Sequence, residues 1–88
     1  MQNVKKGLIV RSILGHDRGE NYIVINIDDK FSYLVNGKIR PISNPKKKSL
    51  KHIVKIGESE EIIKLMEANK LDNSVIIKIL KEFKQGGC

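Results

Sequence analysis

Two short segments of the chain carry the residues best suited to chemistry, and both segments are cationic. The first is the loop Gly15-His16-Asp17-Arg18-Gly19. Its glycines let backbone amides approach a phosphate closely, and Arg18 can bind a phosphate with two hydrogen bonds or stack on a base. The alternative interpretation is a loop whose glycines satisfy turn geometry alone. The segment therefore predicts either an anion-binding loop or a structural turn.

The second segment is the run Lys46-Lys47-Lys48, which Lys51 and His52 follow closely. Lysine ammonium groups bind phosphates as point charges, which gives affinity for a polyanion without base selectivity. The preceding proline should hold the run extended, so that alternate lysine side chains project to opposite sides. The alternative is an ordinary solvated surface.

Three neighbouring side chains complete the candidate binding set. Lys38 and Arg40 lie on the adjacent expected strand and would extend the basic patch. His52 could stack on a base, bond a phosphate or pack at the edge of the sheet. The full set of candidate binding residues is Gly15, His16, Arg18, Gly19, Lys38, Arg40, Lys46, Lys47, Lys48, Lys51 and His52.

Catalytic patterns are missing from the sequence. There is no phosphate-binding Gly-x-x-x-x-Gly-Lys-Ser/Thr loop, no His-Glu-x-x-His and no nucleophile with a partner base. Asp28-Asp29 is typical of a tight turn. The two histidines have no second type of ligand nearby, and Cys88 is a single terminal cysteine without a partner. We expect no enzymatic activity, no catalytic residues, no metal site and no cofactor.

The charge is unevenly distributed along these 88 residues. The net charge is +7, but residues 1–56 hold twelve basic and four acidic side chains, whereas residues 57–88 hold five and six. A polyanion is the expected partner of such a basic region. No apolar run approaches the roughly 18 residues of a membrane span, and the start of the chain lacks the apolar core of a secretory signal. We expect a cytoplasmic protein with no membrane partner.

The elements that must position the cations are mostly strands. Apolar and β-branched runs predict strands at 8–13, 22–27, 31–35, 38–42 and 50–54. Residues 14–21 form a loop, and Asn36-Gly37 predicts a hairpin whose second arm carries Pro41 at a sheet edge. Five short strands joined by tight turns favour a small curled barrel. We expect this barrel to span residues 1–56.

Residues 57–88 have the pattern of a helical hairpin. Ser59 can cap a first helix, and Asp72 can cap a second, with Leu71 and Ile76 placed as a hydrophobic staple. Apolar side chains then recur at helical spacing until Gly86-Gly87. The apolar face of this tail either packs on or beside the barrel or docks a protein partner.

The motifs together resemble a known family. Gly7-x-x-Val10 with Gly15-x-Asp17-Arg18-Gly19 is similar to the KOW motif, and the downstream segments resemble the fourteen-e type large-subunit ribosomal proteins. These segments are Asn36-Gly37, Asn44-Pro45-Lys46-Lys47-Lys48 and Leu50-Lys51-His52-Ile53. Nearly the whole chain looks like the short bacterial KOW-domain RNA-binding proteins, which add a helical tail. Asn36 replaces the usual aspartate of the family, and Asn21 replaces a frequent basic residue.

The resemblance implies an SH3-like five-stranded barrel with a C-terminal two-helix hairpin that binds structured RNA, most plausibly ribosomal RNA or the ribosome. The four aromatic side chains are Tyr22, Phe31, Tyr33 and Phe83. Phe31 and Tyr33 share one strand face, which favours core packing over base stacking. We therefore expect recognition of folded RNA through its backbone. The alternative function is a protein-interaction adaptor, related to translation or transcription factors, that uses the helical tail.

Overall fold

The computed structural model describes residues 4–86, with side chains described up to Phe83, so Cys88 lies outside the described residues. The elements, in chain order, are β1 (Leu8–Ser12), β2 (Asn21–Ile27), β3 (Phe31–Val35), β4 (Lys46–Ser49), the 3-10 turn η1 (Leu50–His52), β5 (Ile53–Glu58), α1 (Glu60–Glu67) and α2 (Asn73–Gly86). The fold is mainly β with two C-terminal helices, as the sequence predicts.

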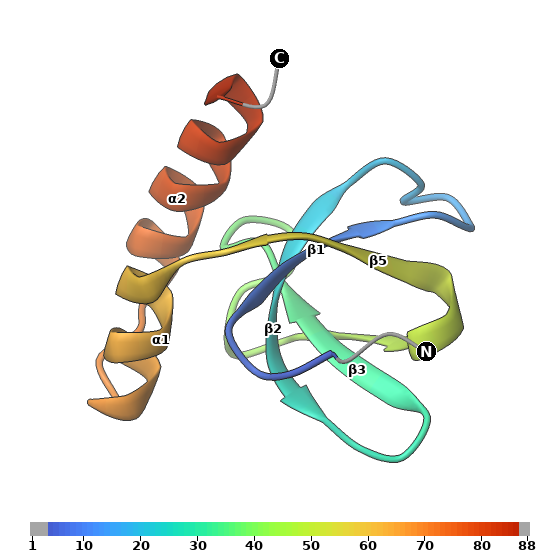
Figure 1. Cartoon of the computed structure of the whole chain (residues 1–88), viewed down its shortest axis with the longest axis horizontal. Helices are drawn as coiled ribbons and strands as arrows, with labels where there is room; N and C mark the ends of the chain where they lie inside the picture. Colours follow the sequence, from blue (N-terminus) through green and yellow to red (C-terminus); the bar gives the residue numbers. More distant parts are fainter. Residues whose placement is uncertain (1–3, 87–88) are drawn as a thin grey trace.

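The five strands form a single antiparallel sheet in the order β4-β3-β2-β1-β5. β4 and β5 are therefore its two edges. Within residues 4–86 no ladder joins these edges, so backbone hydrogen bonds do not close the sheet. Both helices lie together on one side of the sheet (Figure 1).

The expected strand at 38–42 is wrong. Residues 36–40 instead form a turn held by local hydrogen bonds. Asn36 Oδ1 accepts hydrogen bonds from the backbone N–H groups of Lys38 and Arg40. The backbone N–H groups of Asn36 and Gly37 donate to the carbonyl of Arg40. Ile42 N–H donates to the side chain of Asn73 in α2 at 2.9 Å. The partner of β3 is β4, which starts at Lys46.

The expected strand at 50–54 begins later than predicted. Residues 50–52 form the turn η1, because the Ser49 hydroxyl accepts a hydrogen bond from Lys51 N–H and caps it. β5 starts at Ile53 and continues to Glu58, pairing with β1. The last strand therefore lies later in the sequence than predicted, and only Ser59 separates it from α1.

Both helix caps form as predicted. The Ser59 hydroxyl accepts a hydrogen bond from Ile62 N–H, and Glu60 and Glu61 occupy the first turn of α1. Asp72 Oδ1 accepts from Val75 N–H at 2.9 Å at the start of α2. Neither helix, over the residues that the structure describes, is long and apolar enough to cross a membrane.

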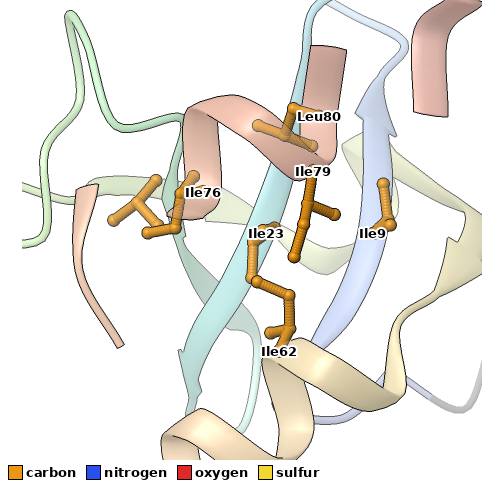
Figure 2. Packing of buried hydrophobic residues seen from close by; sticks show 7 residues of the cluster. Ile9, Ile23, Ile62, Ile76, Ile79 and Leu80 are labelled. Carbon is orange, nitrogen blue, oxygen red and sulfur yellow. The ribbon is translucent and has the colours of Figure 1, made fainter. Parts of the chain in front are cut away.

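The sheet is buried on both faces. On the helix side, Ile9, Ile23 and Val35 pack against buried side chains of the two helices, namely Ile62, Ile76, Ile79 and Leu80. Figure 2 shows Ile79 of α2 pointing down between Ile23 and Ile9, with Ile62 of α1 below Ile23. On the other face, the curl of the sheet encloses a second cluster that includes Leu8, Val10, Tyr22, Val24, Leu34 and Ile53.

The expectation that Phe31 and Tyr33 pack in the core is wrong. Strand alternation turns Ser32 and Leu34 inward, and both are fully buried. Phe31 and Tyr33 share the opposite face, are half-buried and belong to neither cluster. Burial of Ser32 is possible because its hydroxyl donates a hydrogen bond to the carbonyl of Lys48.

Candidate nucleic-acid interface

The loop between β1 and β2 is a compact structure closed by its own backbone. Gly19 N–H donates to the carbonyl of Ser12 at 2.8 Å, and Ser12 N–H donates to the carbonyl of Glu20 at 3.0 Å. Gly19 has φ +91°, a conformation that side chains with a Cβ rarely adopt. Turn geometry therefore requires glycine here, while Gly15, His16, Arg18 and Gly19 remain exposed at the surface.

Asp17 is the centre of this loop. Its Oδ1 accepts hydrogen bonds from the Ser12 hydroxyl at 2.9 Å and from Lys48 Nζ at 2.7 Å. Its Oδ2 accepts one from the Tyr22 hydroxyl at 2.9 Å. The Lys48 and Asp17 side chains are only 10% and 13% exposed. The Asp17 carboxylate thus connects the loop to β1, β2 and β4.

The hydrogen bonds determine the charge state of Asp17. Burial raises the pKa of the carboxyl group, but the hydrogen bonds from Lys48, Tyr22 and Ser12 outweigh burial and lower the pKa to about 2. Burial and the Asp17 carboxylate both raise the pKa of Tyr22 well above its ordinary value. Asp17 is consequently ionised and Tyr22 neutral throughout the physiological range.

The lysine run alternates, as the sequence predicts, and its members therefore differ. Lys48 faces the loop, where its Nζ also donates to the carbonyl of Leu14 at 2.8 Å. Lys47 lies on the opposite face, is exposed, and holds its ammonium group 4.4 Å from the centre of the Phe31 ring. Lys46 is half-buried opposite Leu34. The charge of Lys48 is paired with Asp17, whereas that of Lys47 lies over the Phe31 ring on an exposed face.

The turn η1 lies beside the same loop. Ile13 N–H donates to the carbonyl of His52 at 2.9 Å, which fixes the end of β1 against η1. Lys51 is exposed and His52 half-buried. The two cationic segments found in the sequence thus meet at one end of the sheet, where Lys48 contacts Asp17, 31 positions away in the chain.

Lys38 and Arg40 occupy a different position from the expected one. Their loop follows β3 and lies against the start of α2, where the backbone carbonyl of Asn73 closely approaches Gly37. Lys38 borders a depression that also reaches Gly19. These two cations therefore neighbour the β1–β2 loop from the helix side rather than from a strand paired to the lysine run.

Other surface residues near the site escaped the sequence analysis. Arg11 is exposed at the end of β1, and its Nε donates to the side chain of Asn21 at 3.0 Å. Ile13 and Leu14, at the base of the loop, are 43% and 52% exposed, and Ile39 is 82% exposed. Only Leu14 gave a signal in the sequence, because it lies inside the expected loop 14–21, whereas Ile13 and Ile39 fell in expected strands.

The comparisons with known proteins leave these features without a named counterpart. No protein-family model matches the chain, and the sequence has no significant match among curated proteins.

Proposed function

We propose that this protein is a non-enzymatic, cytoplasmic, bacterial RNA-binding protein that binds structured RNA, with ribosomal RNA or the ribosome as its target. The observation that carries the proposal is the meeting of the β1–β2 loop with the β4–η1 segment. Exposed cations surround this junction, while the acidic side chains of the chain lie mainly after residue 56. Such a surface attracts a phosphate backbone.

The cations around the loop have different proposed roles, because some are exposed and Lys48 is paired with Asp17. His16, Arg18 and Lys51 are exposed around the junction, and Lys47 is exposed on the other face of β4, where its ammonium group lies over the Phe31 ring. Lys48 acts through Asp17 by holding the loop in place. The proposed contacts to RNA phosphates are therefore made by the exposed cations around a loop whose shape Lys48 maintains.

The SH3-like barrel of the KOW proteins belongs to the same proposal. The enclosed cluster on the inner face of the curled sheet supports it, as does the loop bearing Gly15 and Gly19. The role in ribosome binding rests on the sequence resemblance and on the charge distribution, and the proposal includes no cofactor.

The test compares two variants of equal charge. Arg18→Ala with Lys51→Ala removes two exposed cations at the junction of the loop with η1, and Lys64→Ala with Lys70→Ala removes two exposed cations of the helical region. Affinity for purified large-subunit ribosomal RNA is measured by filter binding between about 50 and 200 mM salt. We expect the first pair to weaken binding and to reduce the slope of log affinity against log salt by about 1.5.

Comparing the two variants distinguishes a local effect at the loop from an effect of net charge. The helical variant should retain the affinity and slope of the unaltered protein, because its cations lie away from the loop. Equal losses in both variants would show that only net charge matters, and unchanged binding in the first would remove the assignment of the site.

The adaptor function is a second proposal, favoured by one observation. A groove between β5, α1 and α2 combines apolar Ile79 and Phe83 with the carboxylates of Glu58, Glu61 and Glu82. Deleting residues 57–88 is not a useful test, because the helices complete the core. Instead, Glu61→Lys with Glu82→Lys should leave ribosome association intact if RNA carries the binding. Loss of ribosome association with unchanged affinity for purified RNA would favour the adaptor.

A further inference from the structure

A depression of about 440 Å³ lies between the start of β2, the loop after β3, and α2. This volume is within the range of roughly 300–1,000 Å³ that small-molecule sites occupy. Lys38 borders the depression from the loop and Lys81 from α2, and both side chains are exposed. Two cations that line the depression, one from the loop and one from α2, make the site suitable for an anionic group.

Two asparagine amides of fixed orientation add neutral donors. Asn21 Oδ1 accepts from Arg11 Nε at 3.0 Å, and Asn36 Oδ1 accepts from two backbone N–H groups at 2.9 and 3.0 Å. With both oxygens engaged, the Nδ2 group of each amide is left to donate. Both residues line the depression, so the ligand should be rich in hydrogen-bond acceptors.

The remaining walls exclude a simple inorganic anion as the best ligand. Ile77 and Leu80 supply an apolar surface from α2, which a planar ring can cover. Glu20 supplies one carboxylate, which repels a bare anion but accepts hydrogen bonds from hydroxyl or amino groups. The ligand should therefore combine an anion, an apolar ring face and hydroxyl or amino donors.

We propose that this depression binds one nucleotide, with its phosphate held by Lys38 and Lys81 and its base against Ile77. The inference rests on the proposed RNA binding, which would present an unstacked nucleotide of the RNA beside the β1–β2 loop. Gly19 lies at the border between that loop and the depression, so one RNA strand could contact both. A free nucleotide has the same chemistry and is distinguished by the experiment.

The experiment follows isoleucine methyl resonances of the full chain by NMR. The probes are a short single-stranded oligoribonucleotide, each of the four nucleoside monophosphates, and inorganic phosphate. We expect saturable shifts of the Ile77 methyl with the oligoribonucleotide and at least one monophosphate, and none with phosphate alone. Ile76, fully buried on the same helix, is the reference resonance. Lys81→Ala should weaken binding about fivefold, whereas Lys78→Ala should not.

The outcomes separate the two proposals. Shifts of the amides of residues 15–19 with RNA, together with an unmoved Ile77 methyl, would overturn the nucleotide site and leave the proposed function standing. Shifts of Ile77 with monophosphates but not with RNA would assign the site to a free nucleotide and overturn its role in RNA binding. Absence of shifts at residues 15–19 with structured RNA would contradict the proposed function separately. Equal shifts with inorganic phosphate would overturn the nucleotide site.

Discussion

The two faces of the sheet are stabilised in different ways. On the helix side, the buried residues are aliphatic, and four of the seven come from residues 62–80, far along the chain. On the inner face, the cluster comes from residues 4–53 and ends at a polar group in which Asp17 joins Ser12, Tyr22 and Lys48. The first face depends on packing, and the second depends partly on one ionised carboxylate.

Because of this difference, the stability of the fold and the geometry of the candidate site should respond to different solution conditions. Aliphatic packing responds little to pH or salt, whereas an ion pair depends on both. The loop that presents His16 and Arg18 is held by the ion pair, so its shape should respond to solution conditions before the helices unpack. The following variants test that separation, from the largest expected effect to the smallest.

Ile76→Ala should cost the most stability. The side chain is fully buried between α2 and the sheet, and its truncation leaves a cavity in the helix-side cluster. We expect a loss of about 4 kcal/mol in the free energy of unfolding, measured by urea denaturation. Ile39→Ala, at a site 82% exposed, is the control and should change stability by less than about 0.5 kcal/mol. Similar losses in both variants would contradict the described packing.

Asp17→Asn should cost about 3 kcal/mol, because the nearly buried ammonium group of Lys48 loses its counter-charge. The amide also presents an Nδ2 donor where a carboxylate oxygen accepted a hydrogen bond. Asp28→Asn is the matched control, since Asp28 also accepts from a tyrosine, at Tyr33, but is exposed. The urea midpoint should move much less in the control. A larger effect at Asp28 would refute the central role of Asp17.

Acid should weaken the inner face first. The pKa of Asp17 is about 2 in the folded protein against its ordinary value of 3.8, so its stabilisation is complete above pH 4 and is lost as pH falls towards 2. The loss amounts to about 2 kcal/mol. Urea titrations from neutral pH down to pH 2 should show this decline in the unaltered protein. A parallel decline in Asp17→Asn would show that another group titrates.

Two glycine variants distinguish backbone strain from contact with the helices. Gly19 and Gly37 both have positive φ, +91° and +81°. A Cβ at Gly19 has open space around it, whereas one at Gly37 would lie 2.7 Å from the carbonyl oxygen of Asn73. We expect Gly19→Ala to cost about 1 kcal/mol and Gly37→Ala about 1 kcal/mol more. Thermal unfolding measures both, and equal costs would contradict the close approach.

The parts of the fold that sequence reasoning predicts well are governed by neighbours in the chain. β3 matches its predicted bounds, and the caps at Ser59 and Asp72 form, because residues within three positions decide them. The failures depend on distant partners. Ile42 N–H donates to Asn73, 31 positions away, and this bond accompanies a loop where a strand was expected. No local pattern reveals such a partner.

In the candidate site, too, local features were predictable from the sequence and contacts between distant residues were not. The two cationic segments were visible in the sequence, and the alternation of the lysine run followed from the extended backbone that Pro45 favours, although no strand was predicted there. The pairing of Lys48 with Asp17 was not predictable, because the two residues are brought together only by the pairing of distant strands. The half-exposure of Phe31 and Tyr33 was missed because a two-residue alternation does not say which face is buried.

The edge position of β4 has a consequence for the behaviour of the protein in concentrated solution. An unpaired strand edge can recruit the edge of another molecule and start an aggregate. Lys46 and Lys47 on this edge carry positive charge that makes two copies repel each other, while the charge of Lys48 is paired with Asp17. The lysine run therefore protects against self-association whether or not RNA is bound. Removing all three lysines would leave an uncharged strand edge that can pair with another molecule, so we expect loss of solubility to accompany any loss of binding in such a variant.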